Sequence, residues 1–237
     1  MRLILLAAIG LGGMTAAAAE PPIGSRLGNR LTGSAQKFDE AAAARSAHSA
    51  ARCVVGKRRA AAERLLAATD AEALQRAHRS IWSGQLTCYS GFEDGNELVE
   101  GRRIATPLDI ERGLIAEQLL RQLDQRVSAL PPLPLRQGYY RRTWFGGTGR
   151  DPVVDEMGAC LGDTAPQGIR SILRTDPYTP EEKQAFGALT PVMGKCLSAG
   201  AKLTGNRQSV RAALADALYQ RVLDPAASLQ VIEQAKH

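Results

Sequence analysis

Four cysteines in two equally spaced pairs constrain this chain more than any other feature of its sequence. Cys53 and Cys88 are 35 residues apart, and Cys160 and Cys196 are 36 residues apart. No pair has the Cys-x-x-Cys spacing that redox motifs and zinc knuckles use. An even number of cysteines at recurring spacing indicates disulfides in an exported protein, and four cysteines allow three pairings.

The residues around the two pairs also recur in the same order. Residues 65–70 (LLAATD) resemble residues 172–176 (ILRTD), and residues 112–119 (RGLIAEQL) resemble residues 211–218 (RAALADAL). Chance similarity between Ala- and Leu-rich helices is the alternative explanation. A duplication accounts for both the spacing and the order, and it places one disulfide in each copy. The sequence therefore predicts the disulfides Cys53–Cys88 and Cys160–Cys196.

The first 20 residues have the pattern of a secretory signal peptide. Met1-Arg2 supplies a positive charge, residues 3–9 form a short apolar run, and small residues precede Glu20. The run is shorter than the roughly 20 residues of a transmembrane helix, and no later segment is apolar enough to span a bilayer. A buried N-terminal helix of a cytosolic protein is the alternative. We expect cleavage after Ala19 and a soluble protein that is periplasmic or secreted.

Helical signals dominate the rest of the chain, so the predicted fold class is all-α. Ala-rich segments favour helices by propensity, and strand signals are feeble. Aromatic residues make up only 5% of the chain, so the core must consist mostly of Leu, Ala, Ile and Val. Two tandem copies of a disulfide-linked helical unit would follow the signal peptide. The predicted segments are a signal peptide (1–19), a flexible lead-in (20–36), helical unit 1 (37–130), a Pro-, aromatic- and Gly-rich linker (131–151) and helical unit 2 (152–237).

Local signals predict where several helices begin and end. Residues that can cap a helix N-terminus stand at Asp70, Thr106, Thr179 and Ser209. Thr179 and Glu182 also have the spacing of a capping box. Pro131-Pro132 should end the helix that starts after Thr106, and Val54-Val55-Gly56 is a candidate break in the first long helix.

Arg112 and Arg211 occupy matching positions in the two predicted copies. Each shares a helix face with a small residue four positions later and with a leucine seven positions later. An arginine repeated on a half-buried face indicates a partner acid or carbonyl, which would be left unpaired if the arginine were removed. We therefore expect a structural role for both, and a similar loss of stability when either is replaced by alanine.

The sequence contains no recognisable catalytic, metal or cofactor motif. Its three histidines are His48, His78 and His237, and none stands in a cluster with metal-ligand spacing. There is no Gly-x-Ser-x-Gly motif, and the glycine-rich residues 146–149 lack the Lys-Ser/Thr ending of a phosphate-binding loop. His78 lies on an apolar helical stripe, which favours a structural role. We therefore predict no metal or cofactor and favour a non-enzymatic protein.

A segment rich in aromatic residues and arginine is the candidate contact surface. Aromatic residues and arginines are the usual anchors of interfaces, although here they could simply pack the two copies together. The candidate residues are Tyr139, Tyr140, Arg141, Arg142, Trp144 and Phe145.

Charge narrows the class of partner. The chain has a formal net charge of +6, and basic runs occur at Lys57-Arg58-Arg59, Arg102-Arg103 and Arg141-Arg142. These runs could meet an envelope protein, an anionic lipid or a glycan, or could be ordinary solvated surface. No nucleic-acid motif is present. The predicted function is an exported interaction or envelope-associated binding module. The alternative is an exported hydrolase with a carboxylate-based site between the two helical units.

Overall fold

The computed structural model describes residues 40–83, 88, 106–136, 140–197, 201 and 206–225. All regular secondary structure among these residues is helical, which confirms the all-α class. The predicted signal peptide, the lead-in and Tyr139 lie outside the described residues. The elements are α1 (Glu40–Leu66), α2 (Ala71–Trp82), α3 (Leu108–Gln122), α4 (Asp124–Ser128), the 3-10 helix η2 (Thr143–Gly147), α5 (Pro152–Thr164), α6 (Pro166–Leu173), α7 (Pro180–Cys196) and α8 (Arg207–Leu223).

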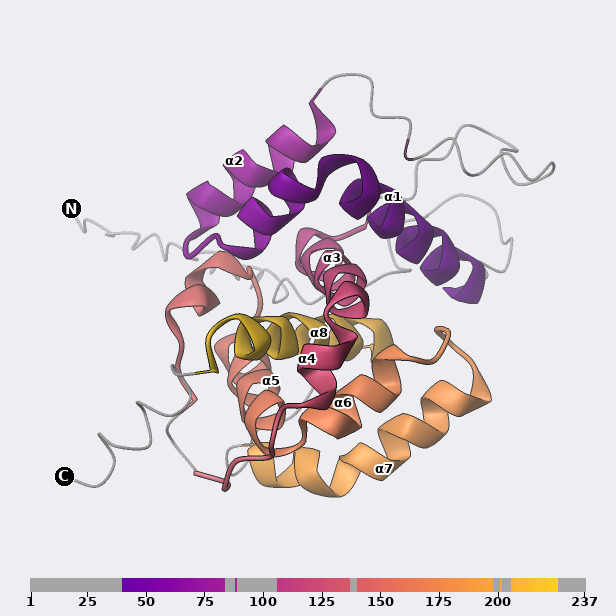
Figure 1. Cartoon of the computed structure of the whole chain (residues 1–237), viewed down its shortest axis with the longest axis vertical. Coiled ribbons are helices and arrows are strands. Elements are labelled where there is room, and N and C mark those ends of the chain that lie inside the picture. The colour runs from indigo at the N-terminus through magenta and orange to yellow at the C-terminus, as the bar shows by residue number, and fades with distance from the viewer. Residues whose placement is uncertain are drawn as a thin grey trace, which may run out of the picture.

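Helices α3 and α8 form the centre of the molecule (Figure 1). Helices α1 and α2 lie on one side of this pair, and α5, α6 and α7 lie on the other. Every residue from 110 to 120 and from 211 to 219 is buried, so neither central helix has a solvated face. A helix that is buried all round must also bury its polar side chains, and these then need partners inside the protein.

The backbones of the two central helices touch where they cross. A Cβ atom added at Gly113 of α3 would overlap the backbone of Ala212 in α8. A second close approach joins η2 to the turn after α1, because a Cβ atom at Gly147 would overlap the carbonyl group of Ala68. Glycine is required at both positions for steric reasons, and these contacts fix the depth at which the elements pack.

The structure contains two disulfides, Cys53–Cys88 and Cys160–Cys196. Their Cα–Cα distances of 5.4 Å and 5.6 Å are typical of native bridges. The first joins α1 to residue 88, and the second joins α5 to the last residue of α7. We refer to α1–α3 as the first half and to α5–α8 as the second half. Each bridge therefore stays within one half.

Each half contains one break in its first helical stretch. Helix α1 continues through Val54-Val55-Gly56, where we expected an interruption, and bends at Arg58 (φ −136°, ψ 39°). Ala165 separates α5 from α6 with nearly the same backbone angles (φ −142°, ψ 49°). Each break lies five residues after the first cysteine of its half. The bend in α1 therefore lies two residues after the glycine rather than at it.

Two of the expected N-caps are present. The Asp70 side chain accepts a hydrogen bond from the Ala73 amide at 2.8 Å. The Thr179 hydroxyl accepts from the Glu182 amide at 3.2 Å, and the Glu182 carboxylate accepts in return from the Tyr178 amide at 2.8 Å. The capping box is thus present with its return bond shifted by one residue.

The other expected boundaries need correction. Helix α3 begins at Leu108 with Pro107 at its N-cap and has no side-chain cap. It ends at Gln122, and the short α4 carries the chain towards Pro131. Asn206 caps α8 in place of Ser209, because its side chain accepts from the Ser209 amide at 2.8 Å. An asparagine one turn earlier starts the helix first, which makes Ser209 a donor rather than a cap.

Candidate functional site

Arg112 is fully buried between the two central helices. Its Nε donates to Asp216 of α8 at 2.7 Å. Its two terminal nitrogens donate to the carbonyl oxygens of Leu65 at 2.6 Å and Leu66 at 2.7 Å. The guanidinium group therefore satisfies the last carbonyls of α1 and pairs with an acid of the other half.

Arg211 makes the corresponding contacts in the second half. Its guanidinium donates to both carboxylate oxygens of Glu117 in α3, each at 2.9 Å, and to Glu182 at 2.9 Å. It also donates to the Thr175 carbonyl oxygen at 2.8 Å, just beyond the end of α6. Each central helix thus gives one arginine to its own half, and each arginine binds an acid of the other half. Both an acid and a carbonyl partner are present at each position.

The acids in these pairs are held in their charged form. Burial alone would raise the pKa of Asp216, but the charges of Arg112 and Arg150 outweigh burial and lower it. Burial opposes ionisation of Glu117 in the same way, yet hydrogen bonds from His48 and Arg211 hold its pKa well below the usual range. Buried carboxylates that are fixed in ionised form hold the fold together and are poorly suited to proton transfer.

The predicted contact segment is mostly packed inside the molecule. Tyr140 and Trp144 are buried in a small cluster with Cys160 of α5 and Ala217 of α8. The Arg141 side chain is 88% exposed, whereas that of Arg142 is 10% exposed. A role in contact with a large partner stays a prediction for this segment. Among the candidate contact residues that the structure describes, Arg141 is the one with an exposed side chain.

A polar cleft of about 180 Å³ lies where the two halves and the linker meet. The end of α1 and the following turn form one wall, η2 and the residue before it form another, and α5 and α8 form the base. Its charged side chains are Arg142, Asp163, Arg221 and Asp224. Thr69, Thr143, Trp144 and Gln220 contribute further polar groups.

One carboxylate organises the charged part of this cleft. Asp163 lies between two guanidinium groups, with Arg142 Nη2 at 3.0 Å from Oδ2 and Arg221 Nε at 3.2 Å from Oδ1. Arg221 also donates to the Pro225 carbonyl oxygen at 3.0 Å. The sequence carries no signal for Asp163, Gln220 or Arg221, because Asp163 lies in α5 and the other two lie in α8, almost sixty residues later. No local motif brings them together.

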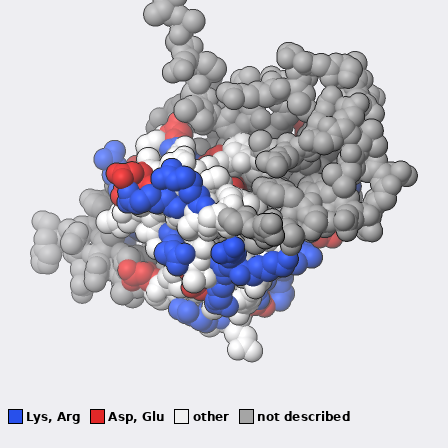
Figure 2. Space-filling model, turned by 90° about the horizontal axis from the view of Figure 1, so that it is seen from above, with Lys and Arg blue, Asp and Glu red and all other residues white. Residues whose placement is uncertain are grey.

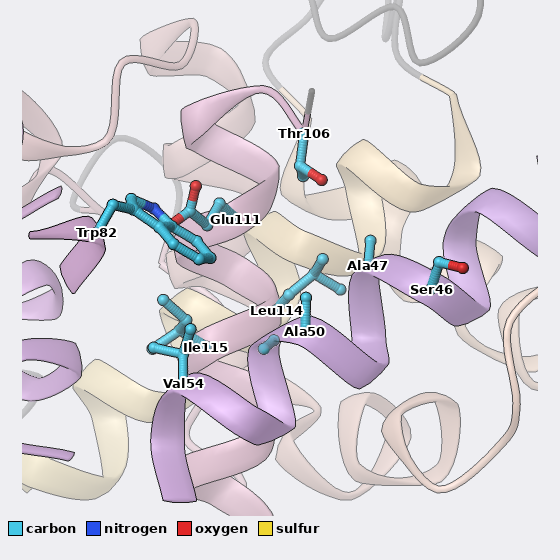
Figure 3. Close-up of a pocket in the computed structure, with 10 residues that line it drawn as sticks. Ser46, Ala47, Ala50, Val54, Trp82, Thr106, Glu111, Leu114 and Ile115 are labelled. Atoms are coloured by element: carbon cyan, nitrogen blue, oxygen red, sulfur yellow. The ribbon is translucent and has the colours of Figure 1, made fainter. Parts of the chain in front are cut away.

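A second pocket lies among α1, α2 and α3 (Figure 3). Trp82 and Glu111 lie together at one end of it, and the Trp82 Nε1–H donates to Glu111 at 3.0 Å. His78 Nε2 is 3.2 Å from the other Glu111 oxygen, and this contact raises the pKa of His78. The pocket encloses only about 20 Å³, which is room for about one water molecule. It is too small to be a ligand site.

Positive charge is concentrated on the outer side of α1 and α2. Residues 40–83 contain eight Lys and Arg but four Asp and Glu, whereas residues 106–201 contain eleven of each. Figure 2 looks onto the α1–α2 side, and blue side chains predominate over red ones on its described part. We call this set the α1–α2 basic surface, and all its members are exposed or half-exposed: Arg45, Arg52, Lys57, Arg58, Arg59, Arg64, Arg76 and Arg79.

Within the described ranges, no three or more His, Cys, Asp or Glu side chains are grouped so that they could hold a metal ion. None of the described helices combines the length and apolarity needed to cross a membrane. No protein-family model, no curated protein and no solved structure matches this chain.

Proposed function

We propose that this protein is an exported, envelope-associated binding module that docks on anionic lipid surfaces through the α1–α2 basic surface. The observation that carries this proposal is the uneven distribution of surface charge. Residues 40–83 have an excess of positive charge, and the long stretch from residue 106 to residue 201 has none. The basic residues of the first two helices are also on the outside of the protein.

The burial of the arginines explains why the two halves present different surfaces. In the second half Arg211 and Arg221 are buried and bind acids of the protein. On the first two helices, Arg52, Arg64 and Arg79 are exposed and have no ion-pair partner among the described residues. Exposed, unneutralised cations attract an anionic bilayer by about 1 kcal/mol per Lys or Arg near the surface. The α1–α2 basic surface therefore supports reversible docking without any membrane-spanning segment.

Export and internal duplication belong to the same proposal. Disulfides persist in oxidising compartments, so the two bridges are compatible with a secreted protein. The matching helix breaks at Arg58 and Ala165 support descent of the two halves from one helical unit. Intact mass and peptide mapping of the secreted protein without reductant test cleavage after Ala19 together with both bridges. A retained N-terminus would contradict export by this route.

Vesicle binding tests the docking surface directly. The variant Arg52→Gln, Arg64→Gln, Arg79→Gln removes three exposed charges that have no ion-pair partner in the described structure. In co-sedimentation with phosphatidylglycerol vesicles, we expect the partition coefficient to fall roughly ten- to a hundredfold. Binding by the unaltered protein should weaken as salt is raised and should be absent with phosphatidylcholine vesicles.

A matched control variant distinguishes binding through the α1–α2 basic surface from binding through the total charge of the protein. The variant Arg141→Gln, Lys183→Gln, Lys195→Gln also removes three exposed charges, but from the linker and α7. It should bind vesicles nearly as well as the unaltered protein. Equal losses in the two triple variants would show that only total charge matters. No binding of the unaltered protein to anionic vesicles at low salt would overturn the proposal.

The hydrolase alternative has one observation in its favour, which is the pair of carboxylates Asp163 and Asp224 in the cleft between the halves. It is the weaker candidate because both Asp163 oxygens contact guanidinium groups. Such contacts favour the charged form and oppose a role as general acid. Turnover of chromogenic glycosides or esters that disappears in an Asp224→Asn variant would favour the hydrolase over the binding module.

A further inference from the structure

We infer that the cleft between the two halves is a binding site for an uncharged, hydroxyl-rich ring, that is, for a saccharide unit. This inference goes beyond membrane docking, because the cleft and the α1–α2 basic surface share no residue. The cleft has the size, charge balance and hydrogen-bonding groups that such a ligand requires.

Several polar groups in the cleft are available to a ligand. The Trp144 indole N–H and the exposed hydroxyls of Thr69 and Thr143 have no hydrogen-bond partner among the described residues. Arg221 is buried, and its Nε faces Asp163 Oδ1 at 3.2 Å as an ion pair without the geometry of a hydrogen bond. These donors and acceptors lie together in one cleft, where they can bind the hydroxyl groups of a polar ligand in place of water.

The charge balance of the cleft favours an uncharged ligand over an anion. The guanidinium groups of Arg142 and Arg221 are matched by the carboxylates of Asp163 and Asp224. A carboxylate or phosphate ligand would have to compete with Asp163 for the same guanidinium groups. A hydroxyl group both donates and accepts, so neighbouring hydroxyls of a sugar ring can bind guanidinium and carboxylate groups without displacing either.

The shape of the cleft agrees with a single ring. At about 30 Å³ for each water molecule in the liquid, 180 Å³ corresponds to roughly six waters, which is enough space for one sugar ring. Trp144 provides an aromatic surface against which the C–H groups of such a ring can pack. The cleft therefore offers apolar contact on one wall and hydrogen bonds on the others, as small-molecule sites generally do.

The polar side chains are held in place before any ligand arrives. Arg142 is fixed by Asp163 and lies over the Tyr140 ring, 6.0 Å from its centroid. Gln220 donates to the Leu66 carbonyl oxygen at 2.8 Å and so joins α8 to the end of α1. Side chains that are already ordered lose little entropy on binding, which favours affinity for a small ligand.

Tryptophan fluorescence can report binding at this cleft. The protein contains two tryptophans, so in a Trp82→Phe background Trp144 is the only indole. Titration with glucose, N-acetylglucosamine and their disaccharides should change this fluorescence saturably for at least one sugar. The same sugar should raise the melting temperature of the protein in its unaltered form.

Neighbouring arginines provide a matched pair of variants. Arg142→Gln removes a cleft donor and should weaken sugar binding about tenfold or more, whereas Arg141→Gln alters an exposed side chain outside the cleft and should leave binding unchanged. Because Arg142→Gln also disturbs Asp163, Thr143→Ala is the second test. It removes only a hydroxyl without a partner and should weaken binding severalfold.

The outcomes decide the ligand class. Binding of phosphate or acetate with no response to sugars would overturn the saccharide assignment. Absence of any response to the sugars, or equal weakening by Arg141→Gln and Arg142→Gln, would overturn the site itself. Vesicle binding is measured separately through Arg52, Arg64 and Arg79, so failure of either proposal leaves the other testable.

Discussion

The two halves of this protein share an internal framework but present different surfaces. In each half a disulfide closes a loop of similar length, and a break follows the first cysteine by five residues. In each half, too, a buried arginine binds backbone carbonyls at or just beyond the end of an earlier helix, α1 for Arg112 and α6 for Arg211. The arginines Arg112 and Arg211 each pair with an acid five positions after the other arginine. Each half therefore gives one buried arginine and one buried acid to the two ion pairs between the halves, an arrangement that we call the reciprocal framework.

The difference between the halves lies in where positive charge is placed. Residues 106–201 contain equal numbers of basic and acidic residues, and the second half uses several arginines internally, whereas α1 and α2 carry an exposed excess of positive charge. Interior positions are constrained by packing and pairing, but exposed positions are free to vary. The contrast teaches that the shared features maintain the fold and that the surface of α1 and α2 is where a distinct function is expected.

The strongest test of the reciprocal framework is loss of a central arginine. Arg112→Ala and Arg211→Ala should each lower the free energy of unfolding by about 3–5 kcal/mol, because each leaves a buried acid and buried carbonyls without their donor. Equilibrium unfolding in guanidinium chloride measures the free energy of unfolding of both variants. Arg174, whose side chain is 61% exposed, pairs with Asp124 at the surface, so Arg174→Ala should cost less than about 1 kcal/mol. Two variants that melt like the unaltered protein would refute the framework.

Removal of one disulfide at a time compares the halves directly. The loops closed are 35 and 36 residues long, so the chain-entropy model assigns each bridge about 4 kcal/mol. We expect Cys53→Ser, Cys88→Ser and Cys160→Ser, Cys196→Ser to reduce the free energy of unfolding by similar amounts. Unfolding curves recorded without reductant check this. A clearly unequal loss would show that native packing, rather than loop closure, sets the contribution of each bridge.

Gly113 tests the point at which the halves cross. Gly113→Ala should destabilise the protein by about 1–3 kcal/mol, because the added methyl group meets the Ala212 backbone. Gly187→Ala is the matched control. Gly187 lies in α7 with open space around it, so the same substitution should stabilise that helix by roughly 1 kcal/mol. Thermal unfolding of the two variants should shift in opposite directions, and parallel shifts would contradict the close crossing.

The smallest expected effect is a pH dependence confined to the first half. The hydrogen bond to Glu111 raises the pKa of His78, so this contact stabilises the protein fully below the unfolded pKa of about 6.5. The stabilisation is lost as pH rises through the higher folded pKa. The effect should be under about 1 kcal/mol, because His78 is partly exposed. Melting temperatures between about pH 6 and pH 8 should fall in the unaltered protein but not in His78→Gln.

Local sequence signals predicted the helical elements well and their exact ends less well. Asp70 and Thr179 cap helices as expected, because a capping bond involves only residues within one turn. The bend at Arg58 and the cap at Asn206 were missed. A bend depends on packing against neighbouring helices, and competing caps differ by amounts that sequence patterns do not resolve.

The candidate sites depended more strongly on the tertiary structure. The sequence shows Arg142 and Trp144 as neighbours in one segment, but not the cleft that they line with Asp163 and Arg221. It also shows the run Lys57-Arg58-Arg59, but not that exposed positive charge is concentrated along α1 and α2. Composition gives the total charge of a chain, and only the fold separates buried arginines from exposed ones.

The sequence by itself determined the helical class, the helix-start signals and the two matched cysteine pairs, because each depends on spacing along the chain. The tertiary structure decided which acids pair with Arg112 and Arg211, where the halves meet, and which basic residues face outward. Those features join residues about a hundred positions apart. They are fixed by the packing of buried helices, where every polar group must find a partner.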